Sequence, residues 1–455
     1  MAATVTAAGQ TAAGVTVMAL VAGDKMSQDA ADQLIHGNGG KSKKTFDADG
    51  MLDKLDELGI DTGRMKDMPE DLEGDGHNMD TRIGSNGSFD ASSGYTSDNI
   101  YTGGDGEAAK TEESRDIKNA KRIGMGVSRA AKDSVIARIA DDTTIDAQGV
   151  KVEAKQETLA DLFGATVAAG GTIGSGLSFT AALLHSNVIA ASQGDVNVHG
   201  KDLKVNAISQ SGEATIEKGS DEELRMAGTI KALGGKLNPT KRSIRAIGLA
   251  VGAGGAAGAA IAAGVVKTDN LTNAPLGGKV TNAANVTVNS DHKYSNVLAA
   301  TVGLAGGEAG IAASIAGVMA NGTVSSELDD SADISGSKPN VSVTTDSIVN
   351  ANTVSLSAAI GCGAGVSAGL SIVRNELTQF TTMERGAAIR NTSSGNGGSL
   401  TVKGKSSTTG SGLLMGLSAG LVGVGIGVGI VNVKPTLETT VGVDGSGTTT
   451  LKGLD

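Results

Sequence analysis

The sequence predicts an all-β protein: a parallel β-helix or β-solenoid with long glycine-rich strands and a partly helical insertion. Three observations favour this fold class. Glycine contributes 68 of the 455 residues, whereas aromatic residues contribute only 2%. Hydrophobic residues alternate with glycine or serine along several long, nearly uncharged blocks. Similar blocks recur at intervals of about 50–60 residues, which is typical of a stacked repeat architecture.

Six blocks rich in glycine and alanine carry the repeat, and their period identifies them as strands. An uncharged block such as Ala246–Val266 reaches the ~20 residues that a membrane-spanning helix needs. Alternation nevertheless favours a strand, because successive side chains of a strand point to opposite faces. Glycine at every second position would also cost a helix about 1 kcal/mol per site. The blocks are Thr4–Ala22, Leu162–Leu184, Ala246–Val266, Val297–Met319, Val354–Val373 and Leu413–Val431.

The alternation defines two unlike faces on each strand. We expect the Val, Ile and Leu face to be buried, and the glycine face to let another backbone approach closely. The blocks are long enough to fold back at Gly170-Gly171, Gly254-Gly255 and Gly306-Gly307, so a series of antiparallel sandwiches is the alternative architecture. The pattern is clearest where Val424, Ile426, Val428 and Ile430 alternate with Gly423, Gly425, Gly427 and Gly429.

Two shorter signals follow most blocks. An asparagine comes first, and we expect it at a corner of the coil, where left-handed backbone is tolerated. A short V-x-V strand comes next, and we expect its side chains to fill a column-like core. The asparagines are Asn187, Asn270, Asn321, Asn375 and Asn432, and the motifs begin at Val150, Val196, Val286, Val341 and Leu400.

Charge and periodicity divide the chain into three parts. Residues 1–22 and 131–455 are predicted to form the β-solenoid, and residues 23–130 a polar, partly helical insertion. Met51–Leu58 has apolar residues at helical spacing and is followed by Gly59, which predicts a short helix. Glu112–Arg122 predicts a second, weaker helix. A further polar insertion around Glu217–Asn238 lengthens one repeat.

No catalytic, cofactor-binding or metal-binding residue is predicted. Thr45–Gly50 resembles part of a calcium loop, but Thr45 stands where the first aspartate should be, so we interpret it as an acidic turn. Cys362 lies on the apolar face of its strand, and we expect it to be buried. An acidic cluster beside His77 is interpreted as a solvated loop, and no histidine pair has zinc spacing. The cluster is Asp71, Glu73, Asp75 and Asp80, and the other histidines are His36, His185, His199 and His292.

The glycine blocks, the Asn-x-Leu/Val-Thr sequences after them and the V-x-V strands resemble large filamentous adhesins, in particular the leukotoxin-type adhesins of fusobacteria. The segment from Met51 to Gly76 resembles the same family. The resemblance covers most of the chain. It implies an internal segment of a very large β-helical protein, exported by an outer-membrane two-partner system and acting in adhesion or toxicity. The family offers no catalytic motif.

The main functional hypothesis is therefore a non-enzymatic scaffold of a secreted or surface-displayed bacterial virulence factor, which presents binding surfaces to a host cell-surface protein or glycan. An outer-membrane secretion partner would serve the parent chain. The net charge of −11 argues against a nucleic-acid partner, and no cofactor is expected. One alternative is a membrane-active, pore-forming toxin that uses the glycine-rich apolar segments, although insertion into a membrane is not favoured. A second alternative is a β-helical polysaccharide-active enzyme.

Overall fold

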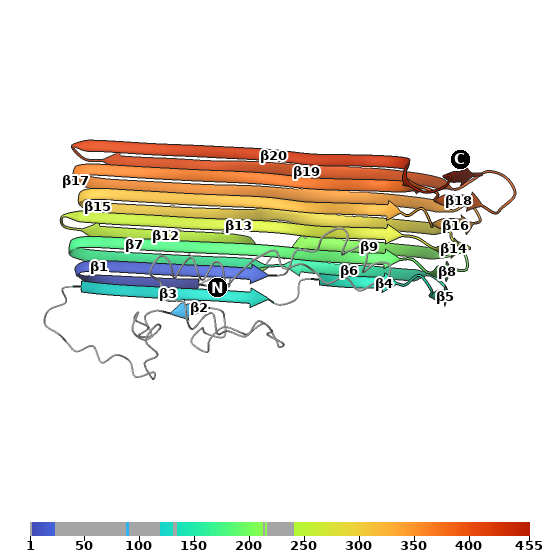
Figure 1. Ribbon diagram of the computed structural model, residues 1–455, viewed down its shortest axis with the longest axis horizontal. Helices are drawn as coiled ribbons and strands as arrows, with labels where there is room; N and C mark the ends of the chain where they lie inside the picture. The colour runs from blue at the N-terminus through green and yellow to red at the C-terminus, as the bar shows by residue number, and fades with distance from the viewer. Residues whose placement is uncertain (1, 23–87, 91–118, 131–133, 213, 216–240) are drawn as a thin grey trace, which may run out of the picture.

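The computed structural model describes residues 2–22, 88–90, 119–130, 134–212, 214–215 and 241–455, which form an all-β protein (Figure 1). Most strands belong to one 13-stranded sheet, and six short strands form a second sheet. The large sheet contains β1 (Ala2–Ala22), β2 (Ser88–Asp90), β3 (Asn119–Ala130), β4 (Ser134–Ile139), β6 (Val150–Thr158), β7 (Ala160–Ser192), β9 (Asp202–Ser211), β12 (Ile244–Gly254), β13 (Ala257–Leu276), β15 (Asn285–Leu328), β17 (Asn340–Arg385), β19 (Ser399–Ala419) and β20 (Val422–Gly445).

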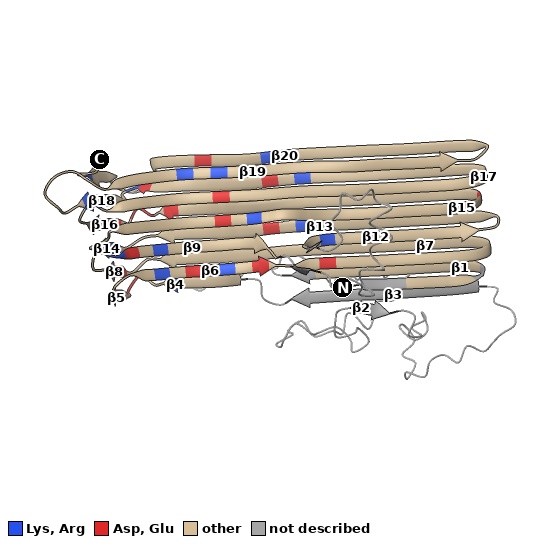
Figure 2. Ribbon diagram, turned by 180° about the vertical axis from the view of Figure 1, so that it is seen from behind, with Lys and Arg blue, Asp and Glu red and all other residues tan. Residues whose placement is uncertain are grey.

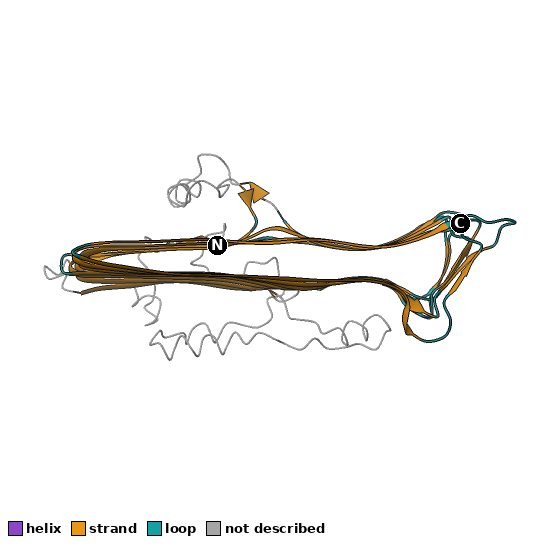
Figure 3. Cartoon of the chain, turned by 90° about the horizontal axis from the view of Figure 1, so that it is seen from above, coloured by secondary structure: helices purple, strands orange, loops and turns teal. Residues whose placement is uncertain are grey.

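The chain repeats one path, which we call a layer. In the layer of β15, the outgoing leg extends from Asn285 to Gly306, where the chain folds back. The returning leg extends from Ala309 to Leu328. A short strand then leads into the next layer. Figure 3 shows the two legs as long, nearly flat sheets, joined at one end by the tips and at the other by the short strands. The short strands are β5 (Thr144–Asp146), β8 (Asp195–Asn197), β14 (Lys279–Thr281), β16 (Asp333–Gly336), β18 (Ala388–Asn391) and β21 (Thr450–Lys452).

Successive layers stack in parallel and in register. Asn285 of β15 pairs with Asn340 of β17, and Leu328 pairs with Met383 at the other end of the same strands. Within the described residues the one antiparallel pairing joins the two short strands β10 (Ala214–Thr215) and β11 (Lys241–Arg242). These two strands lie at the base of the second polar insertion, between β9 and β12.

The half of each layer near the short strands, which we call the body, has a column-like apolar core. Valines of the V-x-V motifs stack in one row, from Val152 through Val205 and Val288 to Val343, and all four are buried. Burying each such side chain contributes roughly 1.5–3 kcal/mol. The predicted column is therefore confirmed in this part of the molecule.

The half of each layer near the tips, which we call the slab, has a different interior. It comprises residues 162–182, 246–266, 299–318, 353–373 and 412–431, which occupy equivalent places in successive layers. Here the two legs approach so closely that large side chains do not fit between them. A Cβ atom added at Gly252 would lie 1.7 Å from the carbonyl oxygen of Ala259, and one at Gly303 would lie 2.4 Å from that of Ala313. The expected close approach of two backbones at the glycine face is confirmed.

The fold-back positions are also as predicted, but their geometry is not that of hairpins. The chain reverses next to Gly170-Gly171, Gly254-Gly255 and Gly306-Gly307, and each leg then pairs in parallel with the next layer. The two legs of one layer face each other across the interior. An antiparallel sandwich is therefore wrong for the described residues.

The expected burial of the apolar strand face is wrong in the slab. Gly361, Gly365 and Ser367 face the interior, whereas Ile360 is 59% exposed and Cys362 is exposed as well. The reason is the narrow separation of the legs, because an interior that admits mainly Gly, Ala, Ser and Thr forces the alternate Ile, Val and Leu outward. Cys362 is consequently a surface residue.

The asparagines that follow the blocks do not form corners. Asn270 and Asn375 lie buried within the returning legs, in the middle of β13 and β17. Left-handed backbone outside glycine occurs instead at the true corners, in His199, Asn282, Lys338 and Asp444. The asparagine was a guide to the repeat but not to the turn.

The helical character predicted for the insertion is not seen, since the described residues contain no helix. Asn119–Arg122, the end of the predicted helix Glu112–Arg122, belongs to β3, which pairs with β1. The other predicted helix, Met51–Leu58, lies outside the described residues. No helix long and apolar enough to span a membrane occurs in the part of the chain that the structure describes.

Candidate interaction surface

Charge separates the body from the slab. Figure 2 shows the coloured charged residues gathered over the body, while the slab is almost uniformly uncharged. Within the five slab segments defined above, Glu308 is the single charged residue, and it lies at the tip of the β15 layer. The outer faces of the slab are built from the alternate apolar residues of the glycine blocks.

The returning legs present the larger apolar face. Their outward side chains line up across the layers, so that Ile311 pairs with Val366 and Val366 with Val424. Ile311 is 56% exposed and Ile426 is 58% exposed. The exposed large side chains of this face are Ile173, Leu177, Ile261, Ile311, Ile315, Val366, Val422, Val424, Ile426, Val428 and Ile430. We call this set, with the small residues between them, the returning patch.

The returning patch is large for a monomer. Residues 422–430 cover about 30 Å along a strand, and the five layers from β7 to β20 cover about 24 Å across. The product is roughly 700 Å², whereas the largest apolar patch of a typical monomeric protein covers about 300–600 Å². Apolar surfaces of this size are typical of interaction sites.

The outgoing legs expose less. Their outer face includes a buried cluster of its own, in which Phe163, Ile247 and Ala300 occupy one row. Exposed apolar side chains occur closer to the tip, at Leu304 and Ile360, and in the last described layer, at Leu413, Met415 and Leu417. The two outer faces of the slab are therefore not equivalent.

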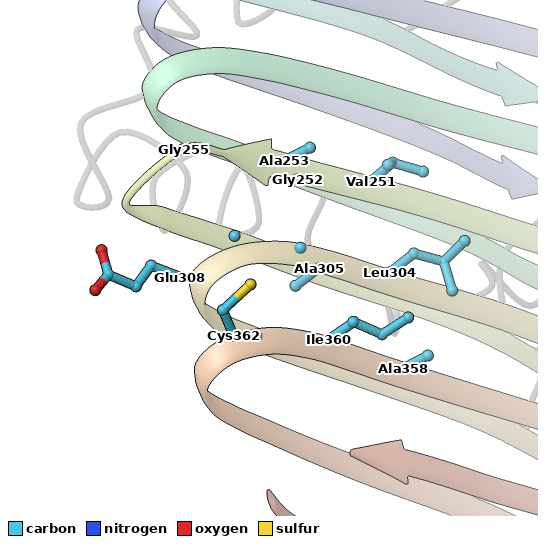
Figure 4. A pocket seen from close by; sticks show the side chains of 13 residues that line it. Val251, Gly252, Ala253, Gly255, Leu304, Ala305, Glu308, Ala358, Ile360 and Cys362 are labelled. Carbon is cyan, nitrogen blue, oxygen red and sulfur yellow. The ribbon is translucent and has the colours of Figure 1, made fainter. Parts of the chain in front are cut away.

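A shallow apolar groove crosses the outer face of the outgoing legs near the tip (Figure 4). Ala253 and Gly306 form its floor, and the larger side chains of Leu304 and Ile360 rise beside it. Glu308 points away from the tip in Figure 4. The other lining residues are apolar or glycine, so the groove offers apolar contacts.

Hydroxyl groups hold the two legs of the slab together. Ser314 and Ser355 contact each other through their Oγ atoms at 2.6 Å, and Thr353 and Ser371 do so at 2.6 Å. The Ser178 hydroxyl donates to the carbonyl oxygen of Gly164 at 3.0 Å. These bonds give the five hydroxyl groups partners, which they need because they are buried away from water.

Charged residues return at the boundary between slab and body. On the outgoing side Arg245 donates to both carboxylate oxygens of Asp161, at 3.2 and 2.6 Å, and both side chains are nearly buried. On the returning side Lys267 and Arg374 lie on either side of Met319, in the row that directly follows the slab segments. Arg374 is paired with Glu376 at 2.8 Å.

The interior also holds a polar cluster where slab and body meet. His292 stacks on Tyr294 with ring centroids 4.6 Å apart, and the Tyr294 hydroxyl lies 3.2 Å from Ser209 and 3.3 Å from Thr158. Burial lowers the pKa of His292 to about 3, and burial likewise raises the pKa of Tyr294. The imidazole is therefore neutral, and its surroundings are closed to solvent.

The other residues singled out in the sequence do not converge on a site in the described residues. Thr45–Gly50, the acidic cluster with His77, and His36 lie outside the described residues. His185 is buried, and His199 pairs with Asp146 at a corner. The part of the chain that the structure describes contains no group of three or more His, Cys, Asp or Glu residues able to hold a metal ion.

The returning patch was missed by sequence reasoning, although its residues were correctly placed on one strand face. The usable signal was the opposite face, where glycine recurs too often to leave room for a conventional core. Comparison with known proteins gives no further guide: no family model, curated protein or solved structure matches this chain.

Proposed function

We propose that this protein is a structural and binding scaffold, a parallel β-helix with very elongated layers. It belongs, on this proposal, to a large secreted or surface-displayed bacterial adhesin of the leukotoxin-like filamentous type. The observation that supports this most is the in-register parallel stacking of equivalent layers from β7 to β20. A body built in this way lengthens by adding layers while its cross-section stays constant, as a stiff rod requires.

Side-chain hydrogen bonds between successive layers of the body support the mechanical role of a stiff rod. Asn285 donates to Asp202 at 2.8 Å, Asn340 donates to the Asn285 side-chain oxygen at 3.3 Å, and Ser399 donates to Asn340 at 3.0 Å. Each bond joins one layer to the next, in addition to the backbone ladder. Partners of such a rod would be a host cell-surface protein or glycan and, for the parent chain, an outer-membrane secretion protein.

The two insertions leave the scaffold without disturbing its register. Ala22 pairs with Leu184, and Ser134 pairs with Asn187. A direct join of Asp24 to Ser134 would therefore place residues 23 and 24 opposite 185 and 186, and the returning leg would continue unbroken. The insertions would be modules presented by the rod.

This arrangement gives a direct test. A chain lacking residues 25–133 also loses β2 and β3, which pair with β1, but β1 keeps its pairing with β7, so we expect most of the strand signal in circular dichroism and the cooperative thermal transition to remain. A matched deletion of residues 213–242 joins Gly212 to Ser243 and keeps Gln210 opposite Lys293 and Ile244 opposite Val297. A control lacking residues 25–132, one residue out of register, should fold poorly because a slip by one exchanges the two strand faces. Loss of the strand signal in both in-register deletions would refute the scaffold.

A membrane-active toxin is the second candidate, and the apolar outer faces of the slab are the observation that favours it. Such a protein should release a trapped dye from lipid vesicles at low protein concentration. Leakage that survives the deletion of residues 25–133 would assign the activity to the layered part of the chain.

A further inference from the structure

We propose that the returning patch is an interface for a second copy of this chain. The two copies pack face to face through their slabs, related by a two-fold axis near Ala313 in the β15 layer. This inference concerns self-association and does not depend on the host partner or on the secretion route proposed above.

The area of the patch fits such an interface. Each copy offers roughly 700 Å², so a face-to-face contact buries about 1,400 Å² in total. Specific and stable protein interfaces bury about 1,200–2,000 Å². The patch is also apolar and flat, which is typical of homodimer interfaces rather than of transient contacts.

The relief of the patch suits interdigitation with a copy of itself. Along β15 the large Ile311 and Ile315 alternate with the small Ala313 and Gly317 on the outward face. Along β17, Val366 and Leu370 alternate with Ala368 in the same manner. A two-fold axis that passes between Ala313 and Ile315 brings Ile315 over Ala313 of the second copy and Ile311 over Gly317, so that large side chains of one copy lie over small ones of the other in this layer.

The charges around the patch complement each other under this symmetry. A two-fold axis near Ala313 places the tip of one β15 layer over the far end of the partner's β15 layer. Glu308 then approaches the row that contains Lys267 and Arg374, which flank the β15 layer on both sides. The one carboxylate of the slab would thus meet Lys267 and Arg374, the second of which also pairs with Glu376, once at each end of the interface.

A lipid bilayer fits these observations less well. Insertion of the slab would surround both of its outer faces with lipid, yet the continuous exposed apolar surface lies on the returning legs alone. Insertion would also carry Glu308 into or across the hydrocarbon. A flat partner of limited area covers the returning patch and leaves Glu308 beside cations.

The first experiment measures the oligomeric state of the whole chain by sedimentation equilibrium. We expect a dimer. The double variant Ile311→Lys, Ile315→Lys should raise the dimer dissociation constant by at least about 100-fold, because it places four lysines at the apolar centre. The control Leu304→Lys, Ile360→Lys changes equally exposed residues of the outgoing face and should remain a dimer. A monomeric wild type, or equal dissociation of both variants, would overturn the proposal.

The second experiment tests the symmetry. Glu308→Lys should weaken the dimer about tenfold, and adding Lys267→Glu and Arg374→Glu should restore it. In a Cys362→Ser background, Ala313→Cys should be cross-linked into a dimer by a bifunctional maleimide with a spacer of about 10 Å, whereas Ala358→Cys on the other face should not, because face-to-face sheets lie about 10 Å apart. Failure of both the charge reversal and the cross-link contradicts the two-fold arrangement.

A third measurement tests whether the returning patch binds a lipid surface instead of a second copy of the chain. The chain is mixed with phosphatidylcholine vesicles and floated on a density gradient. We expect the dimer to stay with the soluble fraction. Flotation of the wild type that is abolished by Ile311→Lys, Ile315→Lys would replace the second copy with a lipid surface and refute the proposal.

Discussion

In the body, Val, Ile and Leu point inward and charged side chains point outward. In the slab, Gly, Ala and Ser point inward and Ile, Val and Leu point outward. Both regions follow the same chain path and the same alternation, and Leu203 of the body is as buried as Ala250 of the slab. The difference lies in the separation of the two legs, because glycine lets the slab close until backbone meets backbone.

This contrast shows that alternation alone does not decide which face of a strand becomes the interior. In the body, stacked valines keep the legs apart and their burial contributes the stability. In the slab, stability comes from hydroxyl bridges such as that between Ser314 and Ser355, and from close contact of small residues. The apolar face of the slab is left exposed.

The largest effect should come from a side chain forced into the slab. We expect Gly252→Val to lower the free energy of unfolding by about 5 kcal/mol or more, because its Cβ would overlap the carbonyl oxygen of Ala259. Gly429→Val is the control, since a Cβ there meets no atom within 4 Å, and it should change stability by less than about 0.5 kcal/mol. Urea unfolding followed by circular dichroism measures both. Equal effects would mean that the slab interior is not closed.

The buried ion pair at the boundary should rank next. Arg245→Ala leaves the nearly buried Asp161 without its cation, so we expect a loss of about 4 kcal/mol. Arg374→Ala removes a short but exposed pair with Glu376 and should leave the urea midpoint close to that of the wild type. A similar loss in the two variants, measured by urea unfolding, would show that the boundary is open to water.

The body should respond to a cavity where the slab does not. Leu203→Ala removes a fully buried side chain and should cost about 3 kcal/mol. Leu413→Ala removes an exposed side chain of the slab and should cost less than about 0.5 kcal/mol. Thermal unfolding of the two variants compares them directly, and a larger loss for Leu413→Ala would reverse the assignment of inside and outside.

The last effect concerns pH, and it is the smallest of the four at neutral pH. Burial lowers the pKa of His292 to about 3, so the folded chain keeps this imidazole neutral, while the unfolded chain binds a proton below its ordinary pKa of 6.5. The contribution of His292 is therefore complete above pH 6.5 and falls by about 1.4 kcal/mol per pH unit between pH 6.5 and 3.

We expect His292→Gln to show a shallower loss of stability than the wild type across this window, as measured by urea midpoints at several pH values. A wild-type slope equal to that of His292→Gln would place His292 in contact with water.

Much of the fold was predictable from the sequence. The alternation over residues 422–430 identified strands where length alone allowed membrane helices, and the paired glycines at 170–171, 254–255 and 306–307 located the tips. The V-x-V motifs located the core of the body. These features are local, because a strand period and a tight turn depend on neighbouring residues.

The features that failed depend on the distance between elements far apart in the sequence. Cys362 and Ile360 are exposed because the returning leg leaves no room beneath them, which no local pattern reports. Asn270 follows a block but lies within a leg, since the returning leg extends well beyond the glycines. The returning patch was hidden by the general rule that apolar faces are buried.

Successive layers differ in length at their tips, while their legs stay in register. Gly307 and Glu308 form the tip of the β15 layer, whereas Gly361–Gly363 form that of the β17 layer, and the register is restored at Ala309 and Ala364. A single residue inserted within a leg would instead turn that layer inside out, with isoleucines against the narrow gap and glycines on the surface. During evolution the legs should therefore tolerate substitution far better than insertion or deletion, and gains or losses of one residue should accumulate at the tips and corners.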